Sequence, residues 1–314
     1  MSGEFERIAR IAASLGPRAR GLGDDCAIIP TGKGRLVVST DASIEGTHFR
    51  LDWIDHREAG WRAAASALSD LAAEAATPAG VLAAVVVPAA AGDEEVVALM
   101  DGVGDAAAAV GAHVVGGDLS QGPSWAVTVT VLGWAQRPVT RAGARPGDGV
   151  WVTGTLGASR AALEAWKRGD QPDPAARAAF AHPVPRIGAG LRLADAGATA
   201  LLDISDGLGG DAQHLADSSH VAIVLDLDAV PVSPACHEEA RRLRISPQRF
   251  AADGGEDYEL LVALPPSFDG NAARAFRREC RLALTRIGSV GTGSGLRASL
   301  AGREVRLSGY DHFR

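Results

Sequence analysis

The sequence predicts an α+β protein with two layered domains, in which helices cover sheets. Strand-like and helix-like segments alternate along all 314 residues, a length that suffices for two cores. In the first half the order is strand-strand-helix-strand-helix-strand-strand, which is typical of a mixed sheet with helices on one face and differs from a doubly wound nucleotide-binding pattern. A stretch rich in Pro, Gly and charge at 137–149 then favours a junction. We therefore expect domains at residues 1–138 and 139–314.

The elements of the first half follow from periodicity and from turn residues. Residues 4–9 have the apolar spacing of a short amphipathic helix. A long Ala-rich segment is expected to be a helix that ends before a Thr-Pro pair. Alternating Val and Thr residues predict a strand with one apolar face. In order, we expect strands at 26–30 and 35–40, a helix at 57–76, a strand at 81–87, a helix at 93–111, and strands at 113–115 and 125–134.

After the junction the alternation of strands and helices resumes. The sequence favours a Pro-rich connection at 171–174 and otherwise regular elements. In order, we expect a strand at 150–153, helices at 158–168 and 185–196, a strand at 200–204, a helix at 209–216, strands at 221–226 and 258–264, and a helix at 267–280. This half is thus expected to be an α/β domain.

Composition narrows the classes of function. The formal net charge is −7 without a long run of Lys or Arg, which argues against nucleic acid or an anionic membrane as the main partner. Three widely spaced cysteines form neither a disulfide framework nor a CxxC metal site, so a reducing cytoplasm is expected. No apolar run approaches the ~20 residues that a membrane span needs.

Aspartates beside glycines and at expected strand ends are the strongest chemical signal. Such residues are Asp25, in GLGDDCAIIP, and Asp41, Asp118, Asp203 and Asp206. Aspartate is also a common cap and turn residue, so each alone has a structural explanation. Carboxylates converging without His or Cys point to Mg²⁺. Because neighbours in an extended segment point to opposite sides, Asp25 is expected to be the ligand and Asp24 to serve the turn.

Asp70 is the exception among these aspartates, because it lies within a helix among Ala and Leu residues and has no obvious structural role there. The Ser-Asp pairs at 69–70 and 205–206 are a weak sign of an internal repeat. A second acidic run, DGGEDYE at 253–259, is compatible with a solvated turn or with a ligand loop. His48, after a glycine loop, is the best histidine candidate for a substrate contact.

Several signatures of common enzymes are missing. The sequence has no GxxxxGK[ST], no GxSxG and no HExxH, and no GxGxxG between a strand and a helix. The residues also do not assemble into a Ser/His/Asp or Cys/His constellation. Covalent catalysis by a protein nucleophile is therefore unsupported.

A set of motifs gives a family resemblance. In order along the chain stand GLGDDCAII, VVSTDASIEGTHF, SALSDLAAEAATP, VVGGDLS, VTRAGARPGD, LLDISDGLGGDAQHLA, GGEDYELLVAL and GYDHF. Together they resemble the thiamine-monophosphate kinases, of the superfamily that includes aminoimidazole ribonucleotide synthetase and selenophosphate synthetase. The resemblance runs from residue 4 to residue 313.

The resemblance implies that ATP phosphorylates thiamine monophosphate with several Mg²⁺ ions, in a homodimer whose N-terminal sheets join beside the ATP cleft. The acceptor is an anionic phosphate oxygen, so positioning and charge neutralisation suffice without a general base. Carried over by position, the catalytic aspartates are Asp25, Asp41, Asp70 and Asp118; the Mg²⁺ ligands are Asp25, Ser39, Thr40, Asp41, Asp70, Asp118, Asp203 and Asp206; the ATP contacts are Gly117, Asp118, Arg141 and Ser205; the substrate contacts are His48, Glu256 and Leu307.

Several positions depart from the family pattern, among them Ala42-Ser43, which replaces a more usual Thr-x pair. Glu74 and Ala75 replace a Met-Gly pair, and Glu74 is expected either to add a metal contact or to be solvated. Leu307 stands where an aromatic residue often stacks on the thiamine ring, with Tyr310 as an alternative. Two other functions stay open: a synthetase of the superfamily that phosphorylates a carbonyl oxygen, and an ATP- and metal-binding module without turnover.

Overall fold

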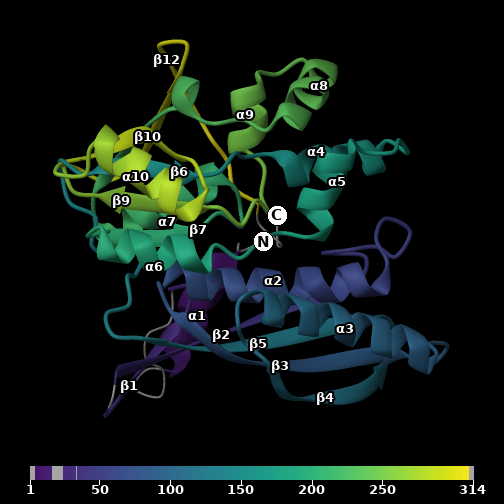
Figure 1. Ribbon diagram of the computed structural model, residues 1–314. Coiled ribbons are helices and arrows are strands. Elements are labelled where there is room, and N and C mark those ends of the chain that lie inside the picture. Colours follow the sequence, from purple (N-terminus) through teal and green to yellow (C-terminus); the bar gives the residue numbers. More distant parts are fainter. Residues whose placement is uncertain (1–3, 16–23, 33, 311–314) are drawn as a thin grey trace.

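The computed structural model describes residues 4–15, 24–32 and 34–310, and it contains two mixed β-sheets that are separated and flanked by helices (Figure 1). The first sheet has five strands and the second has seven. Each sheet draws its strands from one half of the sequence. The predicted α+β architecture is confirmed.

The first sheet has the strand order β1-β2-β5-β3-β4, with only the β3–β4 pair parallel. Its alternation is clearest in β5, where Val127, Val129 and Val131 are buried and the Thr residues between them are not. Helices α2 and α3 cover the buried face, as expected (Figure 1). The strands are β1 (Ala27–Thr31), β2 (Gly34–Ile44), β3 (Thr77–Pro88), β4 (Val114–Gly122) and β5 (Ala126–Ala135).

Helices α2 (His56–Ala73) and α3 (Asp93–Ala109) pack backbone against backbone. A Cβ atom at Gly60 would lie 1.8 Å from the carbonyl oxygen of Leu99, and one at Gly102 would lie 1.9 Å from that of Arg57. Asp55 and Glu58 form a capping box that starts α2. Unlike an ordinary surface helix, α2 is buried on nearly all sides, because the second half of the chain lies on its other face.

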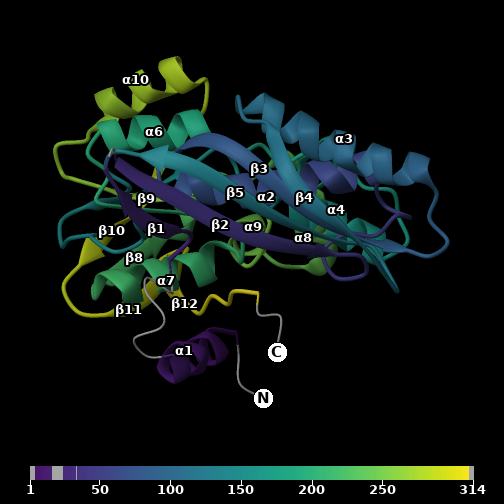
Figure 2. The ribbon, with the colours of Figure 1, turned by 90° about the horizontal axis from the view of Figure 1, so that it is seen from below.

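The second sheet has the order β12-β11-β8-β10-β6-β9-β7, and helices lie around it. In Figure 2, helix α1 (Glu4–Leu15) lies apart from both sheets. The remaining elements are β6 (Gly149–Thr153), α4 (Ala158–Lys167), α5 (Pro174–Ala181), α6 (Ile187–Asp195), β7 (Ala200–Asp203), α7 (Leu208–Ser219), β8 (Ala222–Asp226), η2 (Leu227–Ala229), α8 (Pro234–Leu243), α9 (Pro247–Ala252), β9 (Leu260–Leu264), α10 (Gly270–Cys280), β10 (Leu284–Gly291), β11 (Gly295–Leu300) and β12 (Arg303–Val305).

Several expected boundaries were wrong, and helices α5, α8 and α9 and strands β10, β11 and β12 were not expected. The short strand at 113–115 is the start of β4, which continues to Gly122 because it pairs with β3 along that length. Strand β2 likewise continues to Ile44 through its pairing with β5. The Pro-rich connection leads into helix α5, in which Asp173 caps the first turn and Pro174 takes the first helical position, where proline is favoured.

The two halves share an apolar core, and the second half also has a further apolar cluster of its own. A single cluster of buried side chains includes Val37 and Phe49 from the first half and Phe180, Leu201 and Leu260 from the second. Within the described part of the chain, no helix is both long and apolar enough to span a membrane.

Candidate active site between the two sheets

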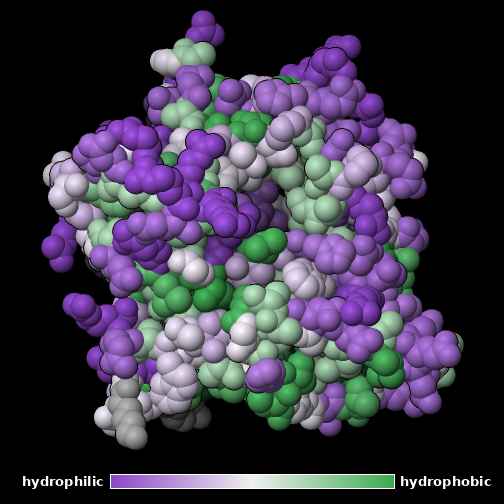
Figure 3. Space-filling view, viewed as in Figure 1, coloured by the Kyte–Doolittle hydropathy of each residue, from purple (hydrophilic) through white to green (hydrophobic). Residues whose placement is uncertain are grey.

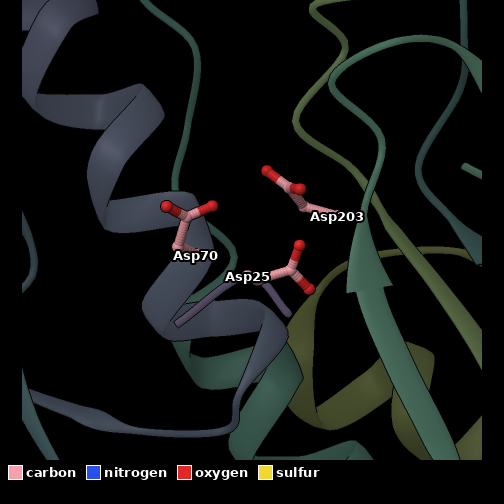
Figure 4. A group of neighbouring side chains, drawn as sticks. All are labelled: Asp25, Asp70 and Asp203. Carbon is pink, nitrogen blue, oxygen red and sulfur yellow. The ribbon is translucent and has the colours of Figure 1, made fainter. Parts of the chain in front are cut away.

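Three carboxylates meet where the two halves face each other. Asp25 precedes β1, Asp70 lies in α2, and Asp203 ends β7; one oxygen of each lies within 4.8 Å of the others. Figure 4 shows the three side chains converging from separate segments. Sequence alone could not establish this convergence, because β7 belongs to the other sheet.

Burial and mutual repulsion raise the pKa values of these groups. Burial, partly offset by Arg141, raises the pKa of Asp25 to about 6. Burial and then the charge of Asp25 raise that of Asp203 to about 8. Burial first, then Asp41 and Asp203, raise the pKa of Asp70 well above its usual range. The charge of Arg141 therefore does not fully offset burial and mutual repulsion, and a bound cation would favour the ionised carboxylates.

Two neighbours hold the cluster in place. The Ser39 hydroxyl donates a hydrogen bond of 2.5 Å to Oδ2 of Asp70. The Arg141 guanidinium pairs with Asp25, and its Nε lies 3.3 Å from Oδ1 of Asp24. Asp24 also accepts from the backbone N–H of Asp25 and of Arg141. Oδ2 of Asp25 is buried without a hydrogen-bond partner among the described residues, so it is available to a ligand.

A cavity of about 740 Å³ opens beside the cluster, between the two halves. Figure 3 shows this hollow on the side of the molecule turned toward the viewer. Asp41, Asp70, Asp203, Ser205 and Asp206 line it, together with His48, Glu256 and Tyr310. The structure thus brings half of the residues predicted from sequence to one cavity, and it places Asp25, Ser39 and Arg141 in the acidic cluster beside it.

At one end of the cavity, Arg62 contacts residues from both halves of the chain, and it is only 3% exposed. Its guanidinium donates to the carbonyl oxygens of His48 (3.3 Å) and Phe180 (2.6 Å) and pairs with the Glu256 carboxylate. It therefore fixes two predicted substrate contacts from different halves relative to each other.

Four predicted residues lie elsewhere. The Thr40 hydroxyl bonds that of Thr130, 2.9 Å away, on the side of the sheet opposite to Ser39. Gly117 and Asp118 lie on the exposed edge strand β4, where a Cβ at Gly117 would overlap β3. Leu307 packs against the core beneath α7 instead of lining the cavity.

The sequence did not predict the contacts of Arg62 and Asp211 or the burial of Glu74. Arg62 on an Ala-rich helix has the appearance of an ordinary solvated residue, and its partners are distant in sequence. Asp211 is buried and accepts from the N–H of Asp206 at 3.2 Å, and burial raises its pKa well above the usual range. Glu74 is fully buried, so of the two alternatives expected for it, the solvated one was wrong.

Both halves match the same protein family. The N-terminal domain of AIR synthase related protein matches residues 23–135, and the C-terminal domain of AIR synthase related protein matches residues 145–300. Together these matches cover most of the chain.

Curated relatives and solved structures agree with this assignment. Thiamine-monophosphate kinase of Mycobacterium tuberculosis is 36% identical over 266 residues, covering 83% of this chain and 80% of the relative. That of Salmonella typhimurium is 35% identical over 331 residues, covering 99% and 98%. The structure described as AaThiL complexed with AMPPCP and TMP superimposes with a TM-score of 0.89 and 32% identity over 99% of this chain and 97% of its own.

Proposed function

We propose a mechanism from the premise that this chain belongs to the thiamine-monophosphate kinase family: it transfers the terminal phosphoryl group of ATP directly to the phosphate of thiamine monophosphate. The observation that carries the mechanism is the convergence of Asp25, Asp70 and Asp203 beside the cavity. ATP is a polyanion and the acceptor group is an anionic phosphate, and an acidic site binds such phosphates only through cations. The carboxylates therefore have a role that caps and turns do not explain.

The donor set fits Mg²⁺. All three converging groups are carboxylates, one oxygen of Asp25 is buried without a partner, and Asp41 and Asp206 line the same cavity. Bound there, Mg²⁺ would neutralise phosphate charge and align the transferred group. Asp25, Asp41, Asp70, Asp203 and Asp206 are the ligands we assign. Ser39 orients Asp70 through its hydroxyl.

Side chains of the protein position the reactants. Arg141, held by Asp24 and Asp25, presents a guanidinium to the nucleotide phosphates beside the acids. Arg62 fixes the His48 loop and Glu256, which we assign to the acceptor. Since a phosphate monoester is already anionic near neutral pH, proton removal by a base is not needed.

We propose that the chain acts as a homodimer through the first sheet. Asp41 is opposite Val129, and Gly117 lies two strands beyond, so roughly 14 Å separate Asp41 from Gly117 at ~4.8 Å per strand. The β4 edge that carries Asp118 also exposes Val115 and Leu119, at 59% and 63%. A second copy on this sheet would bring its Gly117 and Asp118 to the first copy's nucleotide.

Two further assignments accompany this proposal. We place the domain junction at residues 138–139, between the end of β5 and the start of β6, which lie in different sheets. We also propose a cytoplasmic location, because ATP is the phosphoryl donor and Cys26, Cys236 and Cys280 are all free thiols.

The decisive experiment follows product formation from ATP, Mg²⁺ and thiamine monophosphate. We expect thiamine diphosphate and ADP in equal amounts. Asp70→Asn and Asp203→Asn are expected to lower kcat at least 100-fold while circular dichroism shows an unchanged fold. Absence of product at every metal concentration, or full activity of both variants, would contradict the mechanism.

Subunit mixing tests the dimer. Asp118→Asn and Asp70→Asn chains are each expected to be inactive alone, and mixing them is expected to restore part of the activity, because one of the two sites then contains both native aspartates. A mixture as inactive as its components, or a monomer by analytical ultracentrifugation in the presence of ATP and Mg²⁺, would contradict the shared site.

A further inference from the structure

Part of the cavity wall is a rigid aromatic stack. Trp53, from the segment between β2 and α2, lies parallel to Trp166 of α4, with ring centroids 5.3 Å apart and planes within 1°. Phe180 of α5 meets both indoles edge-on, at 6.4 Å and 5.1 Å. Trp53 and Phe180 line the cavity, whereas Trp166 is buried behind them. The Trp53 ring is therefore held in one orientation by contacts from the other half of the chain.

A flat cation already lies over Trp53. The guanidinium of Arg50 is 5.0 Å from the Trp53 ring centroid, and Arg50 and Trp53 both line the cavity, whereas Trp166, which stacks on the same indole, does not. Arg50 is about half exposed and pairs with Asp52, also exposed, at 2.8 Å. Such a surface ion pair contributes little free energy, so a ligand can displace this guanidinium with a small loss of stability. The cavity-facing side of Trp53 thus accepts a planar cation.

We propose that Trp53 is a specificity-determining residue of the acceptor site, where it stacks against the cationic thiazolium ring of thiamine monophosphate in the place now taken by the Arg50 guanidinium. The inference rests on the proposed function, which puts the acceptor phosphate near the acidic cluster of the same cavity. Tryptophan is the strongest aromatic partner of a cation, and Trp166 prevents the ring from turning away. Leu307, the position where the family often has an aromatic residue, packs on α7 instead.

The other charged side chains nearby are already engaged. Lys167 pairs with Glu164 at 3.5 Å, and both line the cavity. Arg160 donates to the carbonyl oxygen of Phe250 at 2.7 Å, and its guanidinium lies 4.5 Å from that ring. The cationic ring of the ligand therefore meets paired charges on this wall together with the π-face of Trp53 that Arg50 now covers.

Steady-state kinetics with both substrates varied separate this role from a structural one. Trp53→Leu keeps apolar contact with Trp166 but removes the π-face, and it is expected to raise the KM for thiamine monophosphate ~10-fold or more while the KM for ATP stays unchanged. Trp53→Phe keeps an aromatic face and is expected to retain most of the affinity. Arg50→Ala uncovers Trp53 and is expected to lower the KM for thiamine monophosphate.

A binding measurement gives a second readout. Thiamine monophosphate, and free thiamine more weakly, are expected to quench tryptophan fluorescence of the wild-type chain, and the quenching is expected to disappear in Trp53→Phe. A Trp53→Leu variant with native circular dichroism and an unchanged KM for thiamine monophosphate would overturn the inference alone. A higher KM in Arg50→Ala would also overturn it, because Arg50 would then be the binding group. A wild-type chain that forms no thiamine diphosphate would overturn the proposed function and this inference together.

Discussion

Replacing Glu74 by Met is expected to stabilise the metal-free protein, and increasingly so as the pH rises. Glu74 is the residue that follows α2; it is 0% exposed, and neither carboxylate oxygen has a hydrogen-bond partner among the described residues. Burial, followed by the charges of Asp24 and Asp25, raises the pKa of Glu74 from 4.5 to about 10. The folded chain therefore keeps a proton that the unfolded chain releases above pH 4.5.

The size of the effect follows from linkage. At pH 7.5, three pH units above the ordinary value of 4.5, this proton lowers the free energy of unfolding by on the order of 4 kcal/mol, at ~1.4 kcal/mol per unit. The sign is that of a raised carboxyl pKa: the loss is absent below about pH 4.5 and grows as the pH rises toward 10. At about 2 °C per kcal/mol in a protein of this size, Glu74→Met is expected to melt about 8 °C higher.

The assay is thermal unfolding in EDTA between pH 5.5 and pH 9. Glu74→Gln is the matched variant, because it removes the titration but keeps a buried polar group; its gain is expected to grow with pH while staying below that of Met. Glu94→Gln, at an exposed position of α3, controls for the charge change. A difference between Glu74→Met and wild type that stays constant or shrinks as the pH rises would refute the reasoning.

Three other outcomes follow from local geometry and charge. Ala75 has a φ of +51°, a conformation that favours glycine, so Ala75→Gly is expected to raise the free energy of unfolding by about 1 kcal/mol in urea titrations. Gly102→Ala is expected to cost on the order of 3 kcal/mol by the same measurement, because its Cβ would overlap α2, whereas Gly104→Ala, with open space around it, is expected to be neutral or stabilising. Mg²⁺ affinity is expected to rise from pH 6 to pH 8, with proton release in calorimetry, because burial raises the pKa values of Asp25 and Asp203 to about 6 and about 8; an affinity independent of pH would contradict it.

The fold was predictable where local patterns are strong. The alternation of Val and Thr in β5 and the Ala-rich run of α2 each determine one structure, and both elements formed close to the expected bounds. The predicted boundaries of elements were wrong where pairing between distant strands determines them. Strand β4 continues past the Gly-Gly pair because β3 supplies hydrogen bonds along its whole length, which no local propensity reports.

The candidate site was predictable to the extent that a residue conflicts with its local surroundings. Asp70 in an apolar helix is such a conflict, and it lies in the cluster. Arg62 shows no such conflict in the sequence, because its role in the site depends on contacts with Phe180 and Glu256. The tertiary fold brings these two residues near it. The geometry also divides the aspartate pair that follows the Gly-rich segment. Asp25 joins the cluster, whereas Asp24 accepts backbone hydrogen bonds.

Helix α2 gives the two halves a common interior, and this has a consequence for how the protein unfolds. Its buried residues contribute to a single cluster that also contains Phe180 and Leu260 from the second half. Removing the second half would expose α2 to water along a whole side, and removing the first half would uncover the apolar surface of the second half that packs on α2. The chain is therefore expected to melt in one cooperative calorimetric transition despite its two sheets, and a gene fragment encoding one half is expected to yield an aggregating product.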